Sequence, residues 1–218
     1  MPPRAVLFDF ELTLADSTAG VIECANFALV RQGLALAEAE AIRRTIGLPL
    51  PEKFRALSGL ADAPRERAFV DAFLLREQEA MADLTYVFPA AREGIAALRA
   101  RGVRTGIVST KYSAIIERIL ARDGLAECFD VIVGGEDVAR FKPDPEGLLR
   151  ALGRLDLDRA QVLYVGDHPL DARAAAAAGL RFVAALSGCN MREHFAGLAV
   201  TGFVPDLRAL PQLVAQSA

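Results

Sequence analysis

Cysteine is scarce in this sequence of 218 residues, and its pattern argues against two kinds of architecture. The three cysteines, Cys24, Cys128 and Cys189, lie far apart, are odd in number and never have C-x-x-C spacing. This pattern argues against a zinc site and against a disulfide framework. It favours free thiols in a reducing compartment, so we expect a cytoplasmic protein.

The sequence also lacks an excess of positive charge and any long apolar run. Its formal net charge of -3 gives no reason to expect a nucleic-acid partner. The alanine-rich run at 172–178 is flanked by polar residues and is far shorter than the ~20 residues that a membrane span needs. We therefore expect neither nucleic acid nor membrane as a partner. The hydrophobic fraction of 53% is typical of a globular protein with a substantial core.

Short apolar runs alternate with helical patterns along most of the chain. The runs lie at 5–10, 104–110, 130–135, 161–167 and 181–187. Each is too short for a helix, and a helical pattern separates each from the next, which predicts buried parallel strands. This alternation indicates an α/β fold with a doubly wound, mostly parallel sheet. A dinucleotide-binding version is disfavoured, because no G-x-G-x-x-G follows the first run.

Residues 16–86 interrupt this alternation. Ala, Leu, Glu and Arg recur there at helical spacing, and the patterning of a strand is absent. We therefore predict an all-helical domain at 16–86, inserted into an α/β core domain formed by 1–15 and 87–218. Within the core, Asp144 is expected to cap a helix whose first residue is Pro145.

Polar side chains follow the predicted strands at the points where the strands end. They are Asp9, Glu11, Thr13, Ser109, Thr110, Lys111, Lys142, Asp167 and Asp171. In open α/β sheets, ligands bind beyond the carboxyl ends of the strands, so these groups should share one edge. Carboxylates without histidine or cysteine suit a hard cation, Mg²⁺ above all. Hydroxyls and lysines suit phosphoryl oxygens. A Mg²⁺ ion and a phosphate in one site would explain why Asp9 and Glu11 stand so close together.

The same residues carry a family resemblance. The ordered motifs "DFELT" (9–13), "VST" (108–110), "KPDP" (142–145) and "VGDHPLD" (165–171) resemble those of the haloacid dehalogenase-like hydrolases. Within that superfamily, the chain resembles the phosphoglycolate phosphatase-type branch. The resemblance implies a Rossmann-like core with a helical cap at 16–86, and a small phosphorylated metabolite as substrate: phosphoglycolate, a sugar phosphate or pyrophosphate.

The resemblance also implies a role for each motif residue. Asp9 would be the nucleophile that forms an aspartyl-phosphate, and Glu11 would be the acid and base. Lys142 would neutralise negative charge on the nucleophile and the phosphate. The residues implied to bind phosphate or substrate are Thr13, Ser109, Thr110 and Lys111. The implied Mg²⁺ ligands are Asp9, the backbone carbonyl of Glu11, Asp167 and Asp171.

The first motif departs from the family pattern at two positions. Family phosphatases read D-x-D-G-T, whereas this chain has Glu11 and Leu12 at the third and fourth positions. Glu11 keeps a carboxyl group but reaches farther by one methylene, ~1.5 Å. Leu12 replaces a glycine, so it adopts either an ordinary conformation or a strained one. We expect these two changes to affect the catalytic rate rather than the fold.

Two alternative functions share these motifs. A sugar phosphomutase would use the same aspartyl-phosphate and would move phosphate between positions on a sugar instead of releasing it. A catalytically weakened relative would bind a phosphorylated ligand without turnover, and the Glu11-Leu12 pair favours this second alternative.

Overall fold

A computed structural model describes residues 2–188 and 190–216, so the predicted free thiol of Cys189 lies outside the described residues. Cys24 and Cys128 are thiols outside any disulfide, and Cys24 is buried. The chain forms two compact units. The core unit consists of Met1–Ala15 and Val87–Ala218, and the helical unit of Asp16–Tyr86. No helix among the described residues is long and apolar enough to cross a membrane.

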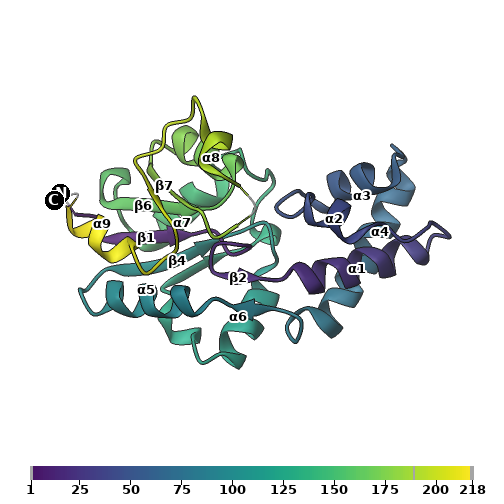
Figure 1. Cartoon of the computed structure of the whole chain (residues 1–218), viewed down its shortest axis with the longest axis horizontal. Helices are drawn as coiled ribbons and strands as arrows, with labels where there is room; N and C mark the ends of the chain where they lie inside the picture. The colour runs from purple at the N-terminus through teal and green to yellow at the C-terminus, as the bar shows by residue number, and fades with distance from the viewer. Residues whose placement is uncertain (1, 189, 217–218) are drawn as a thin grey trace. The chain divides into compact units, whose positions relative to one another are not determined.

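The core unit contains a sheet that has six strands in the described part of the chain, in the order β5-β4-β1-β6-β7-β8 (Figure 1). The strands are β1 (Ala5–Phe8), β4 (Arg104–Val108), β5 (Val131–Val133), β6 (Val162–Gly166), β7 (Arg181–Ala185) and β8 (Gly202–Val204). Every neighbouring pair runs parallel. The predicted α/β class and all five predicted strands are confirmed. The sequence analysis missed β8, an edge strand of only three residues.

Helices connect the strands of the core unit and cover the sheet. They are α5 (Pro89–Arg99), α6 (Ser113–Arg122), α7 (Glu146–Leu155), α8 (Pro169–Ala178) and α9 (Leu210–Gln216). Single 3-10 turns lie at Ala126–Cys128, Gly135–Asp137, Arg159–Gln161 and Arg192–Phe195. The predicted start of α7 was wrong by one residue, because Pro145 is the N-cap and the helix begins at Glu146. Asp144 therefore lies one residue before the N-cap rather than at it, although its side chain still accepts a hydrogen bond from the Glu146 N–H at 3.0 Å.

The central strand β1 is buried on both faces, which explains its uninterrupted apolar sequence. Ala5 and Leu7 belong to a core cluster that includes residues of α7 and α8. Val6 and Phe8 are also fully buried and, because side chains alternate along a strand, face the opposite side of the sheet. Phe8 pairs with Ile107 of β4 and with Val165 of β6. The residues after these three strands are therefore brought to one edge.

The second unit is mainly helical, but its end residues Asp16 and Tyr86 belong to two short strands, where the sequence analysis predicted none. Its helices are α1 (Thr18–Val30), α2 (Ala39–Arg43), α3 (Leu50–Ser58) and α4 (Ala63–Arg76), and α4 continues into the π-helix Glu77–Met81. Three buried phenylalanines form its aromatic core: Phe69 lies 5.4 Å from Phe54 and 6.0 Å from Phe73 between ring centroids. The short strands β2 (Ala15–Asp16) and β3 (Tyr86–Val87) form a separate two-stranded sheet.

Two helical glycines of the core unit provide a matched test of packing. A Cβ on Gly94 of α5 would lie 2.3 Å from the backbone oxygen of Leu207, whereas a Cβ on Gly153 of α7 would meet no atom within 4 Å. We expect Gly94→Ala to lower the free energy of unfolding by about 1–3 kcal/mol, because backbone must move. Gly153→Ala should raise it by about 0.5–1 kcal/mol through helix propensity. Urea unfolding measures both, and equal effects would contradict this packing.

Candidate active site

Asp9 begins the site because it is the first residue after the central strand β1. Its backbone N–H donates to the carbonyl oxygen of Val165 at 2.8 Å, which extends the pairing with β6 by one residue. The Asp9 side chain is buried at the carboxyl edge of the sheet. The register between β1 and β6 then brings Asp167, the residue after β6, beside it.

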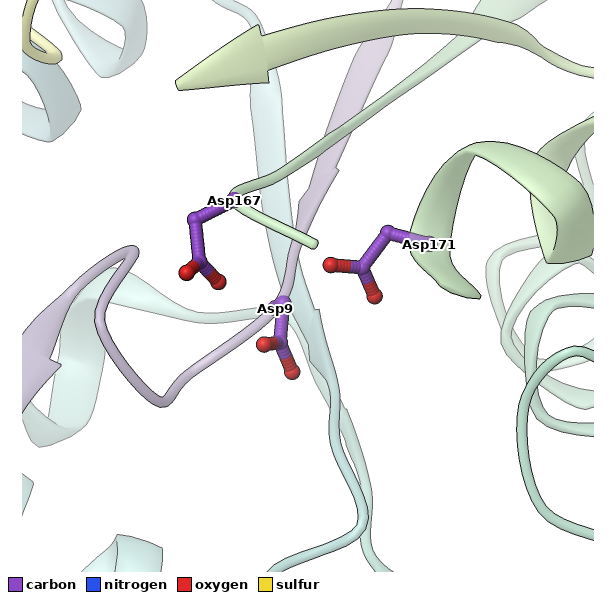
Figure 2. A group of neighbouring side chains, drawn as sticks. All are labelled: Asp9, Asp167 and Asp171. Atoms are coloured by element: carbon purple, nitrogen blue, oxygen red, sulfur yellow. The ribbon is translucent and has the colours of Figure 1, made fainter. Parts of the chain in front are cut away.

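Three carboxylates converge at this edge (Figure 2). Asp9, Asp167 and Asp171 each offer one oxygen, and these oxygens all lie within 4.8 Å of one another. Asp171 stands in the first turn of α8, where its second oxygen accepts a hydrogen bond from the His168 N–H at 3.0 Å. All three side chains are buried. Three negative charges this close together require compensation by positive charge.

Lys142 provides part of that compensation. Its Nζ donates to Oδ1 of Asp9 at 2.8 Å and to Oδ1 of Asp171 at 2.6 Å. The same Nζ lies 3.2 Å from the hydroxyl of Tyr164, which in turn lies 3.0 Å from Asp171 Oδ1. Burial opposes the lysine's charge, but Asp171 and Asp9 raise its pKa well above the ordinary value. Lys142 is therefore a cation.

This lysine compensates the negative charge of the carboxylates only in part. Burial raises the pKa of Asp9 to about 6; Lys142 opposes this change and Asp171 adds to it. Burial, reinforced by Asp171 and Asp9, also raises the pKa of Asp167 well above its usual range. Both groups resist ionisation in the metal-free protein. A bound cation would stabilise the ionised form of both carboxylates.

Thr13 lies beside the acidic cluster, and Ser109 lines a small cavity together with Lys142. The Thr13 hydroxyl lies 3.3 Å from Oδ1 of Asp167, and its side chain is buried. Ser109 follows β4, and its backbone N–H donates to the Val133 carbonyl at 3.0 Å. The Ser109 hydroxyl accepts a hydrogen bond from the Lys111 N–H at 3.3 Å. Thr110 lines the same cavity.

Glu11 and Lys111 meet each other at the same edge. The Lys111 Nζ lies 2.8 Å from Oε1 of Glu11, and both side chains are nearly fully buried. The structure thus brings Asp9, Asp167 and Asp171 together, pairs Lys142 with Asp9 and Asp171, and joins Glu11 to Lys111. This arrangement includes residues from three of the four sequence motifs, and Lys111 directly follows the fourth, at 108–110.

The model of the haloacid dehalogenase-like hydrolases matches residues 6–185 of this chain. The chain belongs to this family. Among its relatives, the plasmid-encoded phosphoglycolate phosphatase of Cupriavidus necator is 35% identical and covers 98% of this chain and 94% of its own length. The phosphoglycolate phosphatase of Cereibacter sphaeroides is 38% identical, covering 81% and 82%. A haloacid dehalogenase-like hydrolase structure from Bacteroides fragilis has a TM-score of 0.92 and 38% identity, covering 95% and 99%.

These similarities confirm the resemblance drawn from the four motifs. They place this haloacid dehalogenase-like hydrolase in the phosphoglycolate phosphatase-type branch. They also show that the family membership extends across nearly the whole chain rather than a single motif.

The structure decides between the two conformations considered for Leu12. Its φ is 57°, in the left-handed region, so the leucine adopts the backbone shape that a glycine would take more easily. The buried loop holds this shape through two hydrogen bonds. The Leu12 N–H donates to the Ala15 carbonyl at 2.7 Å, and the Leu12 carbonyl accepts from the Ser187 hydroxyl at 2.9 Å.

The sequence analysis missed three residues that shape this site. Tyr164 was read only as part of an apolar strand and Ser187 only as the end of another, and Gly188 was assigned no role. The missed glycine has a steric role, since a Cβ on Gly188 would lie 2.0 Å from Oδ2 of Asp167. Gly166 has a similar role, because its Cβ would lie 2.4 Å from Oδ2 of Asp171. The "G-D" pair at 166–167 was the one sequence signal for such close packing.

Gly188→Ala tests whether this close packing sets the position of Asp167. The added methyl group must displace the carboxylate, so we expect the affinity for Mg²⁺ to fall about tenfold or more, since ligand geometry is demanding for this ion. The measurement is the rise in melting temperature as Mg²⁺ is titrated. Gly153→Ala, whose Cβ meets nothing, is the control. An unchanged Mg²⁺ titration in Gly188→Ala would show that Asp167 does not depend on this glycine.

Proposed function

We propose that this family member is a Mg²⁺-dependent phosphatase that hydrolyses a small phosphorylated metabolite through an aspartyl-phosphate. The observation that carries the proposal is the convergence of Asp9, Lys142, Asp167 and Asp171 at the carboxyl edge of the sheet. The names of the relatives make phosphoglycolate the first substrate to test. Sugar phosphates and pyrophosphate are the other members of the proposed class.

The donor set of the site fits Mg²⁺. Its three buried carboxylates offer only oxygen, which is the ligand type this ion prefers. The raised pKa values of Asp9 and Asp167 also indicate an excess of negative charge in the absence of a cation. Asp9, Asp167, Asp171 and the backbone carbonyl of Glu11 are the proposed ligands. When bound, the ion would neutralise charge on the phosphoryl oxygens and orient the substrate.

The residues of the chain carry the proposed reaction. A carboxylate oxygen of Asp9 attacks phosphorus, forming an acyl phosphate while the bond from phosphorus to the ester oxygen breaks. Glu11 gives a proton to the leaving oxygen and later removes one from the attacking water. That water attacks phosphorus, which releases inorganic phosphate and regenerates the Asp9 carboxylate. Lys142 holds Asp9 in place, and its charge stabilises the phosphoryl oxygens.

Hydroxyl groups and the helical unit complete the proposal. The Ser109 hydroxyl and the Thr110 backbone N–H are proposed to bind the phosphoryl oxygens. Thr13 is proposed to support this site through its hydroxyl, 3.3 Å from Asp167. Residues 16–86 are proposed to act as a cap domain that selects the substrate.

Assays on a panel of phosphate compounds test the proposed activity. We expect release of inorganic phosphate from phosphoglycolate, a sugar phosphate or pyrophosphate with Mg²⁺, and none with EDTA. Asp9→Asn should lower turnover by about 10³-fold or more, because the nucleophile is lost. Turnover equal to that of the parent would instead reveal a contaminating enzyme. Folded parent protein that releases phosphate from no member of the panel would contradict the proposal.

The pH dependence of Mg²⁺ binding follows from the raised pKa of Asp9. Protons compete with the cation for this carboxylate, so the affinity should fall as the pH drops through about 6 and be at least about tenfold weaker at pH 5 than at pH 7.

In EDTA, the contribution of Asp9 to the stability of the fold changes with pH in the opposite direction. The folded pKa lies above the unfolded value, so acidification through about 6 stabilises the fold at Asp9. Melting temperatures with Mg²⁺ and with EDTA between pH 5 and 8 measure both trends.

A further inference from the structure

The buried ion pair between Glu11 and Lys111 has no counterpart in the roles that the motifs imply. The Lys111 Nζ lies 2.8 Å from Oε1 of Glu11, with side chains 4% and 8% exposed. Glu11 follows β1 and Lys111 follows β4, and these strands are neighbours in the sheet. Both residues belong to the core unit.

This pair forms where the chain departs from the family pattern. A glutamate has one more rotatable bond than the aspartate expected at this position, so its carboxylate can occupy more places. A misplacement of ~1 Å at a reacting group can cost ~10²-fold in rate. An ammonium group at 2.8 Å in a buried setting fixes the carboxylate strongly, because separating the two charges there is costly.

We propose that Lys111 is a positioning residue that holds the longer Glu11 side chain in place for its acid and base role. The proposal rests on the proposed phosphatase function and differs from the substrate contact expected for Lys111 from the sequence. In this arrangement Lys111 transfers no proton and only holds Oε1 of Glu11. The proton that moves to the leaving oxygen, and later from water, is carried by Glu11.

Kinetics with two leaving groups separate positioning of Glu11 from contact with the phosphate. The leaving oxygen of phosphoglycolate needs a proton, whereas p-nitrophenolate departs without one. We expect Lys111→Met to lower kcat/KM for phosphoglycolate about tenfold or more, and for p-nitrophenyl phosphate less than about threefold. The inhibition constant of inorganic phosphate should stay within about twofold. An equal loss for both substrates with weakened phosphate inhibition would show that Lys111 contacts the phosphate, and would overturn the proposal.

A double-mutant cycle tests whether Lys111 acts through Glu11. Glu11→Gln keeps the length of the side chain but removes its proton transfer. In the Glu11→Gln background, Lys111→Met should change kcat/KM for p-nitrophenyl phosphate and for phosphoglycolate by less than about twofold, because the group it positions no longer acts. Equal losses in both backgrounds would overturn the proposal.

Melting temperatures in EDTA provide a readout that needs neither substrate nor metal. Each single variant, Lys111→Met or Glu11→Gln, should melt about 5 °C or more below the parent, because it removes one charge of a buried ion pair. The double variant should recover part of that loss. If the losses in melting temperature of the two single variants were additive in the double variant, Glu11 and Lys111 would not interact, and the proposal would be overturned. If the parent hydrolyses no substrate, the proposed function and this inference fail together; if it does and the cycle is additive, only this inference fails.

Discussion

The crowding of like charges at the carboxyl edge of the sheet is the constraint on which the rest of the site depends. Asp9, Asp167 and Asp171 are buried with oxygens within 4.8 Å of one another. Lys142 offsets part of that charge, and the pKa of Asp9 still remains raised to about 6. A fold that existed only to be stable would not place three carboxylates together in this way. The cluster is suited to receive positive charge, which is the basis for proposing a cation there.

The parallel sheet supplies the rigidity that such crowding requires. Pairing on both sides of β1 fixes Asp9, and glycines at 166 and 188 let backbone approach the other two carboxylates more closely than any side chain would allow. Leu12 is held in a left-handed conformation in the same loop. Conformations of this kind cost free energy and persist only where the surrounding structure imposes them. Holding the site in one geometry therefore lowers the stability of the core unit.

Different parts of this site were accessible to sequence reasoning for different physical reasons. Apolar runs of strand length located the sheet, and the rule that ligands bind at the carboxyl ends of strands then brought Asp9 and Asp167 together. Lys142 lies in a loop after its strand, so its role followed only from the family motifs. The contact of Lys111 with Glu11 joins loops 100 residues apart, and that of Gly188 with Asp167 joins loops 21 residues apart. No local periodicity encodes either contact. Tyr164 was missed because a buried tyrosine in a strand looks like core unless its hydroxyl partner is known.

The order of the strands has a consequence for biosynthesis. Asp9 is among the first residues to be made, but its neighbouring strand β6 and the helix that carries Asp171 come more than 150 residues later. Contacts of such long sequence separation form late and slowly, because a large loop must close first. A nascent chain would thus emerge from the ribosome with Asp9 exposed but without the residues that surround it in the folded core unit. The topology delays assembly of the site until β6 and α8 have been made.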